Sequence, residues 1–112
     1  MEITEERRAD VLILRVIGKL DAATSKALED KILPVIAAGQ ERLVVELSQL
    51  EYISSAGLRV FILAAKRMEE SKGKMILSSL KDSVKQVFDI AGFSSFLCLA
   101  GSTEEAIKSC ST

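Results

Sequence analysis

The chain has no histidine among its 112 residues. Histidine is the side chain that most often acts as a general base near neutral pH, and its imidazole is the commonest metal ligand. Its absence removes the usual centre of a hydrolytic or metal-dependent site. We therefore expect no catalytic residue, no metal site and no cofactor.

Cysteine is scarce as well. Cys98 lies in an apolar run and Cys110 near the end of the sequence, without CxxC spacing. Disulfides are rare in cytosolic proteins, so we expect two reduced thiols. The charged residues 1–10 lack the apolar region of a signal peptide, and no apolar run approaches the ~18 residues that span a membrane. These observations predict a cytoplasmic protein without membrane insertion.

Neither sign of charge is in excess. The chain has 15 Lys and Arg against 16 Asp and Glu, a formal net charge of −1. Nucleic-acid-binding proteins usually carry a basic excess or patch, so we expect no direct nucleic-acid binding. Apolar residues make up 48% of the chain, enough for a packed core. The length fits one domain, residues 1–112.

The hydrophobic pattern alternates between strands and helices. Short β-branched runs indicate strands, and apolar residues at helical spacing indicate helices. The predicted strands are 1–8, 11–18, 42–48, 74–80 and 96–100, and the predicted helices are 21–40, 55–71, 81–92 and 102–110. This β-β-α-β-α-β-α-β-α order predicts an α/β domain, with a mostly parallel sheet of about four to five strands and about four helices.

Single residues add detail to this prediction. Pro34 lies inside the 21–40 pattern and should kink that helix or split it in two, and Gly39 should end it. Charges on the edge strand 1–8 discourage edge-to-edge pairing and favour a monomer when the chain is free. Phe93 and Phe96 are expected to pack in or against the core.

The segment EYISSAGLRVF, residues 51–61, puts two serines and a glycine at the start of a predicted helix. Serine is a favoured N-cap, worth about 1 kcal/mol over alanine, which explains one of the two. Neither serine is followed three residues later by the Glu or Gln of a capping box. Gly57 should cost up to about 1 kcal/mol there, unless the backbone closely approaches the sheet or a partner. The segment is therefore either a capped, tightly packed junction or a site.

Helix N-termini in such a sheet lie at the carboxyl edge of the strands, where α/β proteins usually bind. The segments GKLDAATS, LSQLEYISSAGL and LSSLKDSV form three such junctions. A phosphoserine carries about −1.5 to −2 charges, and the free N–H groups of a helix N-terminus stabilise it. A serine in this place suits a charge switch.

These residues resemble the signature of the STAS domain family, in particular bacterial anti-sigma factor antagonists. The similarity covers nearly the whole chain in order and spacing. Ser54 stands where the family often has Asp, and Glu46 replaces another frequent Asp. The matching residues are Gly18, Leu20 and Asp21, then Glu46-Leu47-Ser48, Tyr52-Ile53 and Ser54-Ser55-Ala56-Gly57-Leu58.

The resemblance implies a small α/β sandwich that acts in transcription regulation. The unphosphorylated form binds an anti-sigma factor with serine kinase activity and frees a sigma factor. Phosphorylation of a serine at the start of the second helix breaks the complex, and a serine phosphatase resets it. The acceptor falls on Ser55, with Ser54 as second candidate. The expected partner-binding residues are Asp21, Ser54, Ser55, Ala56, Gly57 and Arg59.

Alternatives stay open at several positions. Asp21 also fits an N-cap, and Arg59 fits a solvated helix face as well as a contact to partner or phosphate. Ser78 and Ser79 are interpreted as junction residues that could flank the same surface. No S-x-x-K or G-x-S-x-G motif accompanies Ser55, so we expect no enzyme. The alternative function is a non-switching STAS docking subunit of a transporter or sensory assembly.

Overall fold

The structure, a computed structural model, describes residues 1–110. Strands and helices alternate along these residues, and residues 111–112 of the predicted domain lie outside the described range. The elements are β1 (Glu2–Arg8), β2 (Val11–Leu20), α1 (Ala22–Ala37), β3 (Arg42–Glu46), β4 (Leu50–Ile53), α2 (Ser55–Glu70), β5 (Lys74–Ser78), α3 (Asp82–Ile90), β6 (Cys98–Ala100) and α4 (Thr103–Cys110).

The sheet has the spatial order β1-β2-β3-β5-β6. β1 is antiparallel to β2, and the pairs β2–β3, β3–β5 and β5–β6 are parallel. β4 lies off this path and pairs in parallel with the last residues of β2. The predicted α/β fold with a mostly parallel sheet is confirmed, and the charged first strand is an edge, as expected.

The strand β4 is missing from the prediction, which left residues 49–54 without an element. Its two middle residues are exposed and its two outer residues are buried, so neither an apolar run nor strict alternation marks it. The register of β2 shifts between Gly18 and Lys19, and from there its last residues pair with β4. A β-bulge redirects the end of a strand. The sequence of residues 50–53 does not predict the bulge in β2, so it does not predict this pairing either.

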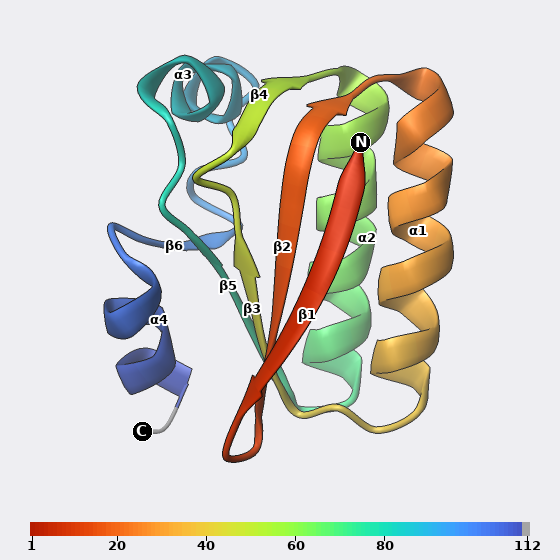
Figure 1. Cartoon of the computed structure of the whole chain (residues 1–112), viewed down its shortest axis with the longest axis vertical. Coiled ribbons are helices and arrows are strands. Elements are labelled where there is room, and N and C mark those ends of the chain that lie inside the picture. Colours follow the sequence, from red (N-terminus) through yellow and green to blue (C-terminus); the bar gives the residue numbers. More distant parts are fainter. Residues whose placement is uncertain (111–112) are drawn as a thin grey trace.

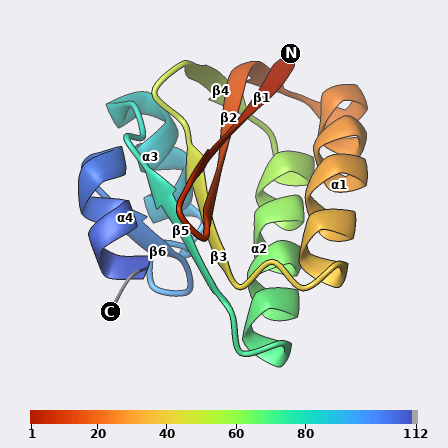
Figure 2. The same cartoon turned by 60° about the horizontal axis from the view of Figure 1, so that its bottom comes forward.

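The helices cover the two faces of the sheet unequally. Figures 1 and 2 show α1 and α2 side by side on one face and α4 on the other. Alternation along β2 supplies both faces, because Leu12 and Leu14 belong to the larger core and Val11 and Ile13 to the smaller one. The smaller core under α4 consists of Val11, Ile13, Val44, Ile76, Ala106 and Cys110.

Of the two effects predicted for Pro34, a kink or a split into two helices, the split does not occur, because α1 runs without a break through Pro34. Pro34 lies on the exposed side, whereas Ile32 and Ile36 are buried against the core. Proline removes a single backbone hydrogen bond, and packing of the buried side keeps the helix continuous. Gly39, at φ +99°, lies just beyond the end of α1, where a stop was predicted.

A chain of charged side chains ties β1 to its neighbours. Arg15 on β2 lies 2.7 Å from the carboxylate of Glu6 and 3.4 Å from that of Glu46 on β3. Glu6 also pairs with Arg8 at 2.8 Å, and Arg8 reaches Glu104 of α4 at 2.7 Å. The network therefore joins three strands and one helix.

Acid should weaken this network. Hydrogen bonds from Arg8 and then Arg15 hold the pKa of Glu6 below its ordinary 4.5. Because the folded-state pKa is lowered, Glu6 contributes stability above its unfolded pKa and loses that contribution as pH falls through the folded value. We expect the free energy of unfolding to fall less from neutral to strongly acidic pH in Glu6→Gln than in the wild type.

Denaturant titrations at several pH values measure this difference. Glu2→Gln is the matched control, because Glu2 lies on the same strand and makes no ion pair within residues 1–110. Glu2→Gln should follow the wild type. An unchanged pH dependence in Glu6→Gln would show that the network does not stabilise the fold.

Candidate functional site

The carboxyl ends of β2 and β4 bring two helix N-termini together. Leu20 pairs with Ile53 across these strands, and the Ser54 N–H donates a hydrogen bond to the Leu20 carbonyl at 2.8 Å. Asp21 and Ser54 follow directly as the N-caps of α1 and α2. Both helices start at the same end of the molecule (Figure 1). The first two of the three predicted junctions therefore lie side by side at the carboxyl ends of these strands.

Asp21 forms a capping box with Thr24. The Thr24 N–H donates to the Asp21 carboxylate at 2.9 Å, and the Asp21 N–H donates to the Thr24 hydroxyl at 2.9 Å. The hydrogen bond from the Thr24 N–H, and then a second one from the Thr24 hydroxyl to the same carboxylate, hold the pKa of Asp21 below its ordinary 3.8, so the side chain is anionic near neutral pH. The N-cap interpretation is confirmed. Asp21 is also exposed, so its place in a partner surface stays a prediction.

The two serines occupy different positions. Ser54 is the half-buried N-cap of α2, and its hydroxyl accepts a hydrogen bond from the Gly57 N–H at 3.4 Å. Ser55 is the first residue of α2, is exposed, and its hydroxyl makes no hydrogen bond within residues 1–110. One serine therefore serves the fold, and the other has a free hydroxyl at the surface.

Gly57 is required by the packing of α2 onto the strand ends. A Cβ at this position would lie 2.8 Å from Ile53 Cγ1 and 3.0 Å from Leu20 Cβ. Real Cβ atoms do not approach so closely, and Gly57 is buried. Of the two reasons considered for this glycine, close approach to the sheet is the one observed. Beside it, Ala56 is half-buried.

The first turn of α2 carries no acidic residue. Arg59 follows Ser55 by one turn, is exposed, and makes no ion pair within the described residues. Residues four apart lie on the same helical face, so the guanidinium is within reach of a group on Ser55. Free N–H groups and the helix dipole also favour an anion there. The geometry is suited to a phosphate on Ser55.

The third junction serves the fold. Ser78 is buried, with its hydroxyl 3.2 Å from that of Thr103 on α4, and the Ser79 N–H donates to the Ala100 carbonyl at 3.1 Å. The interpretation of both serines as junction residues agrees with these bonds. Glu46 accepts a hydrogen bond from the Ser48 N–H at 2.6 Å, which fixes the turn between β3 and β4.

Two exposed aromatic side chains were not anticipated. Phe93 packs against the core as predicted, but Phe96 is 74% exposed, and the prediction that it packs is wrong. Tyr52, two residues before the N-cap of α2, is 50% exposed. Aromatic character alone does not reveal exposure, because the backbone between α3 and β6 decides where the Phe96 ring points.

Among the described residues, no group of His, Cys, Asp and Glu could hold a metal ion. None of the helices in residues 1–110 is long and apolar enough to cross a bilayer. Cys98 is exposed and Cys110 is buried, and both are free thiols, as predicted.

Comparison with known proteins identifies the family. The sequence profile described as STAS domain matches residues 2–106. BtrV of Bordetella bronchiseptica, provisionally named an anti-sigma factor antagonist, is 38% identical over 106 residues, which are 95% of this chain and 91% of BtrV. The anti-sigma-B factor antagonist of Bacillus subtilis is 24% identical over 95 residues, 85% of this chain and 86% of that protein.

Solved structures share the fold. A crystal structure from Thermotoga maritima, also provisionally named an anti-sigma factor antagonist, superposes with a TM-score of 0.93 at 20% identity, covering 98% of this chain and 95% of that one. The phosphorylated form of SpoIIAA from Bacillus superposes with a TM-score of 0.71 at 21% identity, covering 96% and 97%. With the profile match across most of its length, the chain belongs to the STAS domain family.

Proposed function

We propose that this chain is an anti-sigma factor antagonist controlled by phosphorylation of Ser55. The unphosphorylated form binds an anti-sigma factor with serine kinase activity and frees a sigma factor in the bacterial cytoplasm. Phosphorylation stops binding, and a serine phosphatase restores it. The chain acts as a regulatory binding protein and not as an enzyme. The free, exposed hydroxyl of Ser55 at the start of α2 carries the proposal, and the names of the relatives support it.

The local geometry favours Ser55 over Ser54 as the acceptor. A phosphate on Ser55 breaks no hydrogen bond of the described fold and sits at a helix N-terminus without acidic neighbours in its first turn. A phosphate on Ser54 would instead disturb the cap to the Gly57 N–H at a half-buried position. Modification of Ser55 therefore changes the surface and leaves the fold intact.

The modified surface presents two neighbouring anions to a partner. Asp21 is already charged at the start of α1, and the hydrogen bond from Ser54 to Leu20 holds the two helix starts together. A phosphate adds like charge and strongly hydrated oxygens to this edge. About 1.4 kcal/mol of repulsion and desolvation already weakens binding tenfold.

Phosphosite mapping by mass spectrometry tests the proposal on protein isolated from its own cells, in growth and under stress. We expect a phosphate on Ser55 whose occupancy changes with condition. A phosphate on Ser54 instead would contradict the assignment of the acceptor. No phosphate in any condition would contradict the switch and support a static docking subunit.

Partner binding gives a second readout. Ser55→Ala should retain a kinase-type anti-sigma factor during purification from the native cells, and Ser55→Asp should lose it. With the purified partner, we expect Ser55→Asp to bind at least about tenfold more weakly. Ser83→Asp is the matched control, because it adds the same charge to an exposed serine in the first turn of α3, and it should bind like the wild type. Equal affinity of Ser55→Ala and Ser55→Asp would exclude a charge switch at this residue.

A further inference from the structure

The exposed side of α2 carries a continuous stripe that begins at Ser55. Its members follow one another at spacings of four and three residues, so they share one helical face. Ile62 is half-buried and the other members are exposed. We name this surface the α2 stripe; it consists of Ser55, Arg59, Ile62, Lys66 and Glu69.

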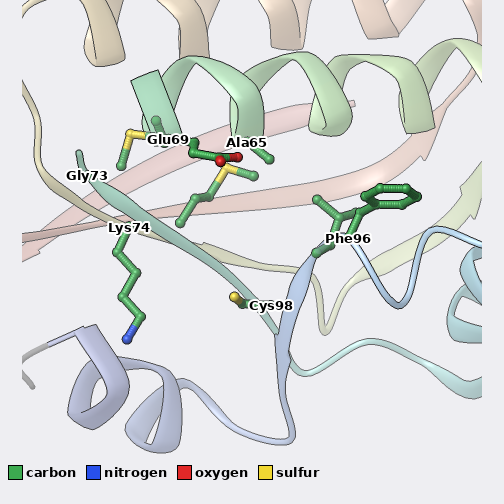
Figure 3. A pocket seen from close by; sticks show the side chains of 9 residues that line it. Ala65, Glu69, Gly73, Lys74, Phe96 and Cys98 are labelled. Atoms are coloured by element: carbon green, nitrogen blue, oxygen red, sulfur yellow. The ribbon is translucent and has the colours of Figure 1, made fainter. Parts of the chain in front are cut away.

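The far end of the α2 stripe borders an apolar groove of about 400 Å³. Phe96 lies at this groove with its side chain 74% exposed. A smaller hollow of about 180 Å³ continues from Phe96 to Cys98, and Figure 3 shows Ala65 and Glu69 on α2 opposite the chain that carries Phe96 and Cys98. We name the larger hollow the Phe96 groove; it is lined by Ile62, Ala65, Lys66, Glu69, Phe93 and Phe96.

We propose that the partner that recognises Ser55 also docks in the Phe96 groove. Its docking element is an amphipathic helix that lies along the α2 stripe and inserts an apolar side chain beside Phe96. This proposal rests on the proposed function, because it names a second contact of the same partner. An amphipathic helix that docks in a groove presents its anchors three, four and seven residues apart. The exposed Arg59 and Lys66 on either side of Ile62 offer such a helix two cationic contacts beside the groove.

The charges along the stripe specify the polar side of this helix. Arg59 and Lys66 are seven residues apart on either side of Ile62, and neither makes an ion pair within residues 1–110. Two helices packed side by side repeat their contacts every seven residues. The partner helix therefore carries two acidic residues seven positions apart, one facing Arg59 and one facing Lys66, with its apolar anchor between them. It also carries a basic residue that faces Glu69.

The Phe96 groove is far enough from Ser55 that phosphorylation should not change the partner's contact there. Ser55 and Glu69 are fourteen residues apart on α2, about 21 Å along the helix at 1.5 Å per residue. Effects of changes at such a distance usually add in free energy. Phosphorylation should therefore lower affinity by the same factor with or without the groove contact.

Titration of the purified partner kinase against variants of the full chain tests the groove. Phe96→Ala should weaken binding about tenfold, since exposed aromatic anchors in pockets dominate interface energies. Ile90→Ala is the matched control, because Ile90 is apolar, 88% exposed and absent from the groove lining. It should change affinity less than about twofold. Both variants should fold, because both side chains are exposed.

Charge changes test the orientation of the partner helix. Lys66→Glu should weaken binding, because it faces an acidic residue of the partner helix. Glu69→Lys should weaken it as well, because it faces the basic residue of that helix. Unchanged or strengthened binding in either Lys66→Glu or Glu69→Lys would overturn the assigned charge pattern. Equal affinity of Phe96→Ala and Ile90→Ala would overturn the groove contact. In that case the switch at Ser55 would still stand if Ser55→Asp loses binding. If Phe96→Ala weakens binding but Ser55→Asp binds like the wild type, the switch is overturned and the groove contact stands.

A fluorophore on Cys98 distinguishes the occupants of the groove. Cys98 is exposed and Cys110 only 3% exposed, so a thiol-reactive, environment-sensitive dye labels Cys98 selectively. Addition of the partner kinase should shift the emission to the blue, and Phe96→Ala should reduce that shift. No shift on saturation with partner would overturn the proposal. A shift that appears without partner and grows with the concentration of this chain would overturn it in favour of a second copy.

Discussion

Gly57→Val is expected to lower the free energy of unfolding by about 3 kcal/mol, at the upper end for overpacking a dense core. Even a bare Cβ at this position would lie 2.8 Å from Ile53 Cγ1 and 3.0 Å from Leu20 Cβ, and valine adds two methyl groups beyond it. Neither backbone can withdraw, because Leu20 and Ile53 are both buried and pair with each other at the ends of their strands. The first turn of α2 must therefore move away from the sheet.

Urea unfolding followed by circular dichroism measures this loss. Ala56→Val is the matched control: it introduces the same side chain at the adjacent, half-buried helical position. Its lower helix propensity should cost less than about 1 kcal/mol. Gly57→Val should also shift the NMR signal of the Ser54 amide, whose hydrogen bond to the Leu20 carbonyl depends on this packing. Equal stability of the two variants would contradict the packing account of Gly57.

Phe61→Ala should have the larger effect, a loss of about 4 kcal/mol. Phe61 is fully buried on α2, and its ring centroid lies 6.2 Å from that of Phe88 on α3. Removal of the ring leaves a cavity between the helix that carries Ser55 and the helix that leads to Phe93 and Phe96. The surroundings can collapse only in part, because interiors are close-packed.

Thermal and urea unfolding of Phe61→Ala, Phe61→Leu and Phe96→Ala measure this loss. Phe61→Leu keeps much of the buried volume and should lose clearly less than Phe61→Ala. Phe96→Ala removes the same ring from an exposed position and should stay within about 0.5 kcal/mol of the wild type. A similar loss in Phe61→Ala and Phe96→Ala would mean that Phe61 is not part of the rigid core.

Most of the fold could be predicted from local pattern. The runs VLILRVIG and RLVVELS are apolar and β-branched, and they become β2 and β3. β4 could not be predicted, because its pairing depends on a register shift in β2 that lies more than thirty residues earlier. The continuity of α1 through Pro34 follows from tertiary packing on the opposite side of the helix, which a local rule omits.

The candidate site shows the same limit. The sequence places Ser54 and Ser55 at a helix start, but it does not say which of them caps. The extended backbone of Ser54, at φ −92° and ψ 174°, and its hydrogen bond to Leu20 make it the cap. The Phe96 groove could not be predicted from the sequence, because residues 62–69 and residues 93–96 meet only through the placement of α3.

Within residues 1–110, α4 is the one helix over the second face of the sheet, and this has a consequence for biosynthesis. β2, β3 and β5 leave the ribosome before α4 does, so Val11, Ile13, Val44 and Ile76 stay uncovered until Ala106 and Cys110 arrive. During that interval the nascent chain exposes an apolar sheet face, the kind of surface that chaperones bind and that aggregates form from. Substitutions in α4 should therefore reduce the yield of folded protein in cells, while the protein that does fold carries an unchanged surface around Ser55.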